Sequence, residues 1–255
     1  MQIKKQVAVV TGGGSGMGAA VANMLYGHGA KVAVWDMNDE AGQKIAKEAK
    51  GISVVCDVSD EKSVEQALKT TIDAHGSAPR IVVNCAGILK GQRLLNREGP
   101  ADLDHFEAMI KVNLMGTYNV MRLTGFEMAQ LDPLDLDESR GVIINTASIA
   151  AYEGQIGQVG YSASKAGVIG MTLPAARELG KFGVRVMAIA PGAVETPMIK
   201  GVKDEIRQRI EKKIPFPQRF AKPDEFARLV HHIIDNNMLN GTCIRLDGAS
   251  RLEPK

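Results

Sequence analysis

VAVVTGGGSGMG, residues 7–18, is the stretch that decides the fold of this chain. It joins an apolar, β-branched run, typical of a buried strand, to a glycine-rich turn. Apolar residues at helical spacing follow it. Glycines let a backbone turn tightly and approach a phosphate, and the free N–H groups at a helix start favour negative charge. The stretch therefore predicts a strand, loop and helix around a nucleotide pyrophosphate, and the alternative is a plain glycine-rich turn.

Similar apolar runs recur along the chain and alternate with helical patterns. The predicted strands are Val7 to Thr11, Val32 to Trp35, Ile52 to Val55, Ile81 to Asn84, Val142 to Thr146, Val184 to Ile189 and Cys243 to Leu246. Ser59 or Asp60 is suited to cap the helix after the third run. The alternation predicts one Rossmann-type α/β domain over residues 1–255. We expect a doubly wound sheet of about seven mainly parallel strands, flanked by helices, with binding groups after the strands.

The composition is that of a packed globular protein. Hydrophobic residues make up 45% and charged residues 24% of the chain. The 31 Lys and Arg nearly balance the 29 Asp and Glu, which argues against nucleic acid or a membrane as partner. Cys56, Cys85 and Cys243 show no CxxC spacing, and no apolar stretch approaches the ~20 residues of a membrane span. We therefore expect a cytoplasmic protein that binds small molecules.

An acidic side chain ends the second predicted strand. Asp36 lies where a carboxylate can accept hydrogen bonds from both hydroxyls of an adenine ribose. Its charge would repel a 2'-phosphate, and Met37 follows it where a phosphate-binding cation could stand. Asp36 could instead be a simple turn-forming residue, but that role would explain only the acidic residue and not the missing cation. The pattern therefore favours NAD over NADP.

Three later strand ends carry further candidate cofactor contacts. With the glycine-loop residues and Asp36, the predicted cofactor-binding residues are Thr11, Gly12, Ser15, Gly16, Met17, Gly18, Asp57, Val58, Asn84, Ala86, Gly87, Tyr161, Lys165, Pro191, Gly192, Val194 and Thr196. Each later segment also has a structural explanation. Asp57 could form a turn, Asn84 could stabilise the sheet, and Thr196 could cap a helix.

A tyrosine and a lysine open a later helical pattern. Tyr161 and Lys165 in YSASK are four residues apart, which places both side chains on one helix face. A tyrosine with an ordinary pKa of about 10 needs a nearby positive charge to act as a base near neutrality. Lys165 and an oxidised nicotinamide would supply two such charges. YxxxK alone also occurs by chance on exposed helices, so other residues must support it.

Supporting residues occur in order over nearly the whole chain. They are the glycine loop, NCAG at 84–87, Asn113, Ser148, YSASK and the Pro-Gly pair at 191–192. Together they resemble the short-chain dehydrogenase/reductase family. The resemblance implies an oxidoreductase that needs no metal. The five histidines, His28, His75, His105, His231 and His232, show no convincing metal-ligand spacing.

The resemblance also implies a role for each catalytic residue. Tyr161 would transfer the proton, and Lys165 would bind the nicotinamide ribose and depress the pKa of Tyr161. Ser148 would hold the substrate oxygen. Asn113 would hold a water that links Lys165 to solvent, while hydride passes between substrate and nicotinamide.

A closer resemblance concerns the segment from Gly141 to Pro191 and the ending LNGTCIRLDGASRL. Both are similar to the type 2 3-hydroxyacyl-CoA dehydrogenases, which implies an acyl-CoA substrate, a role in fatty acid metabolism and a homotetramer. Gln155 and Gln158 would then border the substrate with Ser148 and Tyr161. A substrate loop is expected within 193–216, where the pattern departs from that group at Glu195. Cations of this region could meet CoA phosphates or simply be solvated: Lys200, Lys203, Arg207, Arg209, Lys212 and Lys213.

Other functions remain open at this point. The same scaffold serves broader secondary-alcohol and hydroxysteroid dehydrogenases and 3-oxoacyl-carrier-protein reductases. A non-catalytic NAD-binding scaffold protein is a further alternative, although it would be expected to lack Ser148, Tyr161 or Lys165. A methyltransferase with a glycine-rich nucleotide loop would not account for YSASK or Ser148. The acidic loop from Asp132 to Glu138 is expected to be a solvated surface segment.

Overall fold

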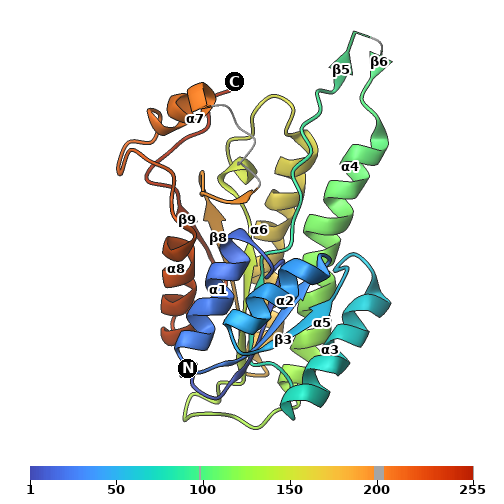
Figure 1. Ribbon diagram of the computed structural model, residues 1–255, viewed down its shortest axis with the longest axis vertical. Coiled ribbons are helices and arrows are strands. Elements are labelled where there is room, and N and C mark those ends of the chain that lie inside the picture. The colour runs from blue at the N-terminus through green and yellow to red at the C-terminus, as the bar shows by residue number, and fades with distance from the viewer. Residues whose placement is uncertain (98, 198–203, 255) are drawn as a thin grey trace.

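A computed structural model describes residues 1–97, 99–197 and 204–254, apart from the side chain of Asp204. Within these residues seven strands form one parallel sheet in the order β3-β2-β1-β4-β7-β8-β9 (Figure 1). They are β1 (Val7–Thr11), β2 (Lys31–Asp36), β3 (Ile52–Val55), β4 (Ile81–Asn84), β7 (Gly141–Thr146), β8 (Val184–Pro191) and β9 (Cys243–Leu246). All seven strands expected from the sequence are confirmed. Three of them, β2, β7 and β8, are one or two residues longer than predicted.

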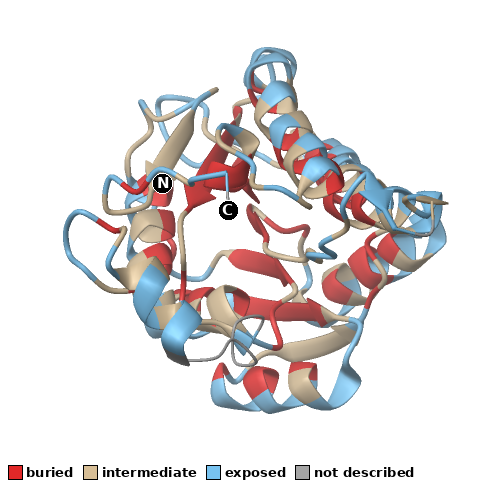
Figure 2. Cartoon of the chain, turned by 90° about the horizontal axis from the view of Figure 1, so that it is seen from above, coloured by how far each residue is buried: buried red, intermediate tan, exposed pale blue. Residues whose placement is uncertain are grey.

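Helices cover both faces of the sheet (Figure 1). They are α1 (Gly16–Gly27), α2 (Asp39–Glu48), α3 (Glu61–His75), α4 (Leu103–Met109), the π-helix η1 (Ile110–Met115), α5 (Gly116–Ala129), the short 3-10 helix η2 (Ile149–Ala151), α6 (Val159–Gly180), α7 (Asp204–Glu211) and α8 (Pro223–Asp235). Leu25 of α1 and Phe226 of α8 belong to the buried core on one face. Leu68 of α3 and Met128 of α5 belong to the core on the other. Figure 2 shows the buried residues inside and the exposed helix faces outside.

The double covering explains why the first strand is apolar without interruption. Successive side chains of a strand point to opposite faces of the sheet. Val9 is buried in one core and Val10 in the other, and both are fully inaccessible. A strand packed on both faces therefore needs apolar residues throughout, as in VAVV.

The strand order reverses between β1 and β4. From β1 the chain extends the sheet first to β2 and β3, then returns to β4 and continues to β7, β8 and β9. In an open sheet of this type, ligands bind beyond the carboxyl ends of the strands at such a reversal. The topology thus places the glycine loop after β1 beside the segment after β4.

Several peripheral features also follow from the sequence. Asp60 caps α3, because its side chain accepts a hydrogen bond from the Lys62 N–H at 2.9 Å. The acidic residues 132–138 are all exposed in the loop before β7, as expected. A small hairpin of β5 (Leu95–Asn96) and β6 (Gly99–Pro100) projects beyond α4 (Figure 1). Among the described residues, the helices are too short or too polar to cross a membrane.

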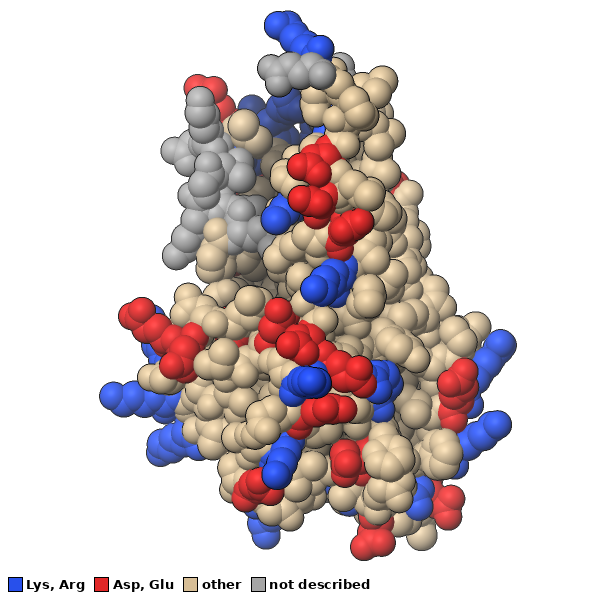
Figure 3. Space-filling view, turned by 90° about the vertical axis from the view of Figure 1, so that its right-hand side faces the viewer, with Lys and Arg blue, Asp and Glu red and all other residues tan. Residues whose placement is uncertain are grey.

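The balanced charge of the sequence is visible on the surface. On the face shown in Figure 3, cationic and anionic side chains are interspersed over the lower, helical part of the molecule. Such mixing weakens the field at a distance, because charges of opposite sign cancel within a few ångströms of one another. This face therefore presents mixed charge to a partner.

Candidate active site

A cavity of about 700 Å³ opens at the carboxyl ends of the strands. Most of the predicted site residues line it: Gly12, Ser15, Gly16, Met17, Gly18, Asp36, Val58, Ala86, Gly87, Ser148, Gln155, Gln158, Tyr161, Lys165, Pro191, Gly192, Val194 and Thr196. Four predicted residues, Thr11, Asp57, Asn84 and Asn113, do not line it. One cavity therefore brings together chain segments from β1 to the residues after β8.

The glycine loop is packed so closely that side chains would not fit. Gly12 has a φ of +60°, and a Cβ atom there would lie 2.8 Å from the backbone of Ala86. A Cβ on Gly18 would lie 2.2 Å from the carbonyl oxygen of Gly12. Ser15 precedes α1 in an extended conformation and makes no side-chain capping bond to the helix. The first N–H groups of α1 thus suit a pyrophosphate, which gains from hydrogen bonds and from the helix dipole.

Asp36 is held in place at the end of β2. Its Oδ2 accepts a hydrogen bond from the Gly14 N–H and its Oδ1 accepts one from the Asn38 N–H, both at 2.9 Å. A carboxylate has about four acceptor positions, so capacity is left for the two hydroxyls of a ribose. The exposed Met37 stands beside it on the cavity wall. Asp36 can therefore accept hydrogen bonds from the ribose of a nicotinamide cofactor.

The serine, tyrosine and lysine come from two adjacent elements. Ser148 follows β7 and begins η2, where its Oγ accepts a hydrogen bond from the Ala150 N–H at 3.1 Å. Tyr161 and Lys165 belong to the first turns of α6, which begins at Val159, near Tyr161 as expected. The Nζ atom of Lys165 lies 5.9 Å from the centre of the Tyr161 ring. The predicted trio therefore lines one cavity wall.

Burial disfavours the charged forms of both titratable residues. It raises the pKa of Tyr161, and a hydrogen bond with Ser148 acts in the opposite direction. It lowers the pKa of Lys165 to about 8, with a smaller opposing effect of Cys85. Ser148 is thus a protein group that lowers the pKa of Tyr161, and the effect expected of Lys165 stays a prediction. A cationic ring bound beside Tyr161 would favour its phenolate further.

The ammonium group of Lys165 is held by a main-chain carbonyl and lies close to Gly87. Its Nζ donates a hydrogen bond to the Thr146 carbonyl at 2.7 Å, and the residue is 4% exposed. A Cβ on Gly87 would lie 3.5 Å from Nζ and 3.2 Å from Asn113 Oδ1. Gly87 therefore leaves room for the ammonium group.

Asn113 lies behind this wall, fully buried in the π-helix η1. Its Oδ1 accepts a hydrogen bond from the Ile88 N–H at 2.8 Å. Its Nδ2 donates to the Ile88 carbonyl at 2.9 Å and to Ser164 Oγ at 3.1 Å. The side chain thus connects the segment after β4 to α6.

Three predicted cofactor contacts have other partners. Asn84 donates through Nδ2 to Asn145 Oδ1 at 2.9 Å and accepts from Thr11 Oγ1 at 3.3 Å. The Thr11 hydroxyl also accepts from the Ala86 N–H at 3.2 Å. Asp57 Oδ1 accepts from both the N–H and the hydroxyl of Ser59, which makes a local turn. Asn84 thus stabilises the sheet and Asp57 forms a turn, while a contact of either residue with the cofactor stays a prediction.

The cavity lining also includes residues that were not named individually from the sequence. They are the apolar Ile88, Leu89, Ile149, Ala150, Ile206 and Ile210 and the C-terminal Ser250, Arg251, Leu252 and Glu253. Ile206 and Ile210 of α7 lie within the substrate loop expected at 193–216, and their helical spacing was the signal that could have singled them out. For the C-terminal residues no local pattern existed, because their place depends on contacts with distant loops.

The expected basic segment divides into separate groups. Arg209 and Lys213 line the cavity. Arg207 instead pairs with Glu195 and, at 3.0 Å, with Glu211. Glu195, the charge that departs from the resemblance, therefore has an ion-pair partner. Met198, Ile199, Lys200 and Lys203 lie outside the described residues.

No group of three or more metal-ligating side chains occurs among the residues that the structure describes. His28, which follows α1, and His231 of α8 stack on each other with ring centres 4.2 Å apart, and neither lines the cavity. The chemistry of the lining residues is instead that of hydroxyl, phenol, ammonium and carboxylate groups.

Comparisons with known proteins agree with this architecture. The family model for short chain dehydrogenase matches residues 6–207. The human protein named 3-hydroxyacyl-CoA dehydrogenase type-2 is 46% identical over 99% of this chain and 97% of its own, and the Drosophila melanogaster protein of the same name is 45% identical over 99% and 100%. A crystal structure of 3-hydroxyacyl-CoA dehydrogenase type-2 from Mycobacterium avium superposes with a TM-score of 0.91 at 41% identity, covering 98% of this chain and 97% of that one. A 3-ketoacyl-(acyl-carrier-protein) reductase from Brucella melitensis, complexed with NADH, gives 0.84 at 26% identity over 98% and 100%. The chain belongs to the short-chain dehydrogenase family.

Proposed function

We propose that this protein is an NAD-dependent dehydrogenase that interconverts 3-hydroxyacyl-CoA and 3-oxoacyl-CoA esters. The observation that carries the proposal is the single cavity that Ser148, Tyr161 and Lys165 share with the glycine loop after β1 and with Asp36 at the end of β2. The relatives named 3-hydroxyacyl-CoA dehydrogenase type-2, at 44–46% identity over 99% of the chain, support the substrate class.

The cofactor residues divide by the part of NAD that each would hold. The first turn of α1 would bind the pyrophosphate, Asp36 the adenine ribose and Val58 the adenine ring. Lys165 would bind the nicotinamide ribose. When bound, NAD accepts a hydride from the alcohol carbon and so supplies the redox chemistry. The fixed carboxylate of Asp36 supports NAD over NADP, because a 2'-phosphate there would meet a negative charge.

Side chains of the protein would bind the substrate oxygen and transfer its proton. Ser148 Oγ would donate a hydrogen bond to the substrate oxygen and hold it beside Tyr161. The Tyr161 phenolate then accepts the hydroxyl proton of the alcohol, and in the reverse direction the phenol returns it to the ketone oxygen. The Asn113 amide is already bonded to Ile88 and Ser164, and its main-chain carbonyl accepts a hydrogen bond from Thr117 Oγ1 at 2.7 Å. A relay water at Asn113 would therefore use the second lone pair of that carbonyl.

Cations on the cavity lining support an anionic, extended substrate. Arg209, Lys213 and Arg251 line the cavity, and the phosphates of CoA are groups that such cations bind. The acyl chain would lie against the apolar lining of Ile149, Ile206 and other residues named above. The two glutamines line the same cavity, and Gln155 Nε2 already donates to the Glu253 carbonyl at 3.1 Å.

The proposed function includes assembly and location. We propose a homotetramer in the cytoplasm, in which an exposed apolar hollow on η1, α5 and α6, lined by Leu114, Tyr118, Met171 and Pro174 among others, is covered by another copy. The three cysteines are free, which suits a reducing compartment. Light scattering of the purified protein should give the mass of four chains, and a monomer would contradict this part of the proposal.

A substrate panel tests the proposal as a whole. NAD-linked oxidation should be measured with short and branched 3-hydroxyacyl-CoA esters, hydroxysteroids and simple secondary alcohols. We expect the highest kcat/KM with a 3-hydroxyacyl-CoA ester. Faster turnover of steroids or plain alcohols would support the broader alcohol dehydrogenase instead, and NAD binding without turnover of any of them would support the scaffold protein.

A further inference from the structure

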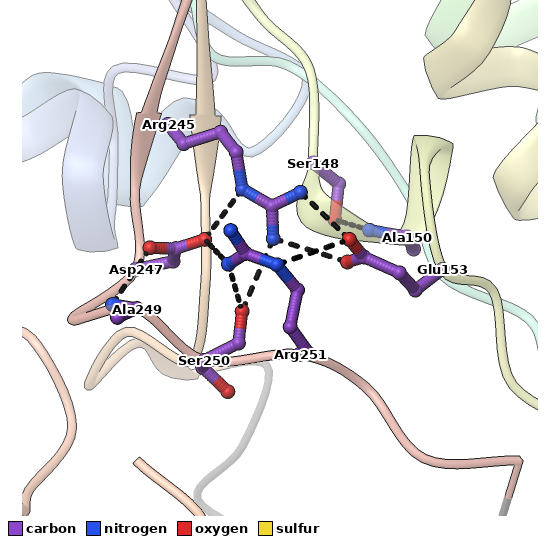
Figure 4. A network of polar contacts seen from close by, with 8 residues as sticks. All are labelled: Ser148, Ala150, Glu153, Arg245, Asp247, Ala249, Ser250 and Arg251. Atoms are coloured by element: carbon purple, nitrogen blue, oxygen red, sulfur yellow. Dashed lines mark hydrogen bonds and ion pairs between the residues drawn. The ribbon is translucent and has the colours of Figure 1, made fainter. Parts of the chain in front are cut away.

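A compact network of charged residues lies next to Ser148, behind the cavity wall. Arg245 donates from Nη1 and Nη2 to the two carboxylate oxygens of Glu153 at 2.8 and 3.0 Å, and from Nε to Asp247 Oδ2 at 2.7 Å (Figure 4). Arg251, which also lines the cavity, approaches the same two carboxylates, at 3.5 Å from Glu153 and 3.3 Å from Asp247. Two cations and two anions thus form one network. Its carboxylates hold the pKa of Arg245 above the ordinary value, so its charge is permanent.

The network connects segments that are far apart in the sequence. Glu153 follows η2, the turn that Ser148 begins, whereas Arg245 is part of β9. Asp247 packs at the segment after β8, because a Cβ on Gly192 would lie 3.0 Å from the Asp247 Cβ. The Tyr152 ring lies 4.9 Å from the guanidinium of Arg245 and covers it further. The paired bond between Glu153 and Arg245 therefore joins the Ser148 loop to the C-terminal segment.

Beyond the network the C-terminal segment follows the same loop. The Ile156 N–H donates to the Pro254 carbonyl at 3.0 Å, and Gln155 Nε2 donates to the Glu253 carbonyl. Lys213, after α7, pairs with the Glu253 carboxylate. Residues 250–253 line the cavity between these attachments. The substrate end is thus walled by a segment whose position depends on bonds to the loop at 153–156.

We propose that Glu153 is a positioning residue for substrate binding, which acts by holding the C-terminal segment 250–254 against the cavity through Arg245 and Arg251. Glu153 itself lines neither end of the cavity. Its loss would leave the two cations of the network with only one of their two shared carboxylates, that of Asp247, and free the segment to move. The effect should then appear in the KM for substrate and not in the binding of NADH. The identity of that substrate rests on the proposed function.

The test compares Glu153→Gln with a matched ion-pair variant elsewhere. Glu225 forms a similar paired bond with Arg219, at 2.8 Å for both oxygens, at the start of α8 and outside the cavity lining. For Glu153→Gln we expect the KM for acetoacetyl-CoA to rise about tenfold, the loss expected for one charge-assisted bond, while the KM for NADH changes less than about twofold. Glu153→Asp keeps the charge but is too short for the paired bond, and it should raise the KM by about threefold. Glu225→Gln should change neither KM.

Two further measurements separate positioning from a general loss of stability. A chain ending at Ser250 should show a raised KM, and adding Glu153→Gln to it should raise the KM no further, because both changes remove the same wall. Amide exchange of peptides covering 153–158 should accelerate in Glu153→Gln and stay unchanged in Glu225→Gln. An additive double variant, or exchange in Glu153→Gln no faster than in the wild type, would overturn the proposal. If the wild type does not reduce acetoacetyl-CoA, the proposed substrate fails, and the exchange comparison alone decides the role of Glu153.

Discussion

At the cofactor end of the cavity the wall consists of main-chain atoms that the sheet holds in place. At the substrate end it consists of loop segments that are held together by side-chain interactions. The glycine loop is fixed by contacts between main-chain atoms, such as the close approach of Gly12 to Ala86. The substrate wall is held by Glu153, Arg245 and the C-terminal segment. Few substitutions would be tolerated in the cofactor wall, which suits a ligand that is always the same. The substrate wall can differ with the sequence of its loops, and we expect it to determine which substrate binds.

The largest expected effect is the loss of turnover on substitution of Tyr161, which lies between the cofactor end and the substrate end of the cavity. Tyr161→Phe keeps the ring but removes the proton-transfer group, so kcat should fall by about 10³-fold while NADH binding changes little. Burial raises the pKa of Tyr161, so oxidation by the wild type should increase with pH through the alkaline range as the phenolate forms. Steady-state rates across the neutral and alkaline range and fluorescence titration of NADH measure both. Turnover near the wild-type rate in the phenylalanine variant would remove Tyr161 from the mechanism.

The rigidity of the cofactor end is tested by adding one methyl group. Gly18→Ala would place a Cβ 2.2 Å from the Gly12 carbonyl oxygen, so the loop must shift, and NADH binding should weaken by at least about tenfold. A Cβ on Gly27, in the same helix, would have no atom within 4 Å, which makes Gly27→Ala the control. That variant should bind NADH normally and gain up to about 1 kcal/mol in the free energy of unfolding. Equal NADH affinity in both variants would show that the loop is not rigid.

Cofactor choice should depend on a single carboxylate. Asp36→Ala removes the acceptor for the ribose hydroxyls, so we expect the Kd for NAD to rise about tenfold and the Kd for NADP to stay equal or fall. Titration of both cofactors against wild type and variant gives the ratio. A wild type that prefers NADP, or a ratio unchanged by the substitution, would contradict the assignment at the end of β2.

The smallest effect concerns a residue that the sequence placed in the cofactor site. Asn84→Ala would remove the side-chain hydrogen bonds that Asn145 Oδ1 and Thr11 Oγ1 make with Asn84 inside the sheet, which should cost about 1–3 kcal/mol of the free energy of unfolding. The Kd for NADH should change by less than about threefold, because Asn84 does not line the cavity. Urea unfolding and NADH titration measure the two quantities. A large loss of affinity with unchanged stability would return Asn84 to the cofactor contacts.

The same contrast explains how far the sequence could predict the molecule. The strands and the glycine loop follow from local patterns, since VAVVTGGGSGMG contains its strand, turn and helix start in one short run. Tyr161 and Lys165 were predictable as a pair because helical spacing alone puts them on one face. For all of these residues the information lies close together in the chain.

The remaining features depend on contacts between distant residues. Glu153 and Arg245 are 92 residues apart, and neither lies in a motif that indicates the other. The C-terminal lining and the side-chain partners of Asn84 likewise become visible only when strands and loops are assembled. The pKa of Tyr161 is another such case, because burial by the whole fold raises it.

One measurement tests both ends of the cavity at once. Reduction of acetoacetyl-CoA and of the same acyl group on a truncated N-acetylcysteamine thioester should be followed with NADH and with NADPH, as kcat/KM for the four combinations. We predict the highest efficiency for NADH with the CoA ester. Each exchange should reduce it by at least about tenfold, independently of the other, because cofactor and CoA are selected at separate ends. Equal efficiency with the truncated thioester, or with NADPH, would contradict the account.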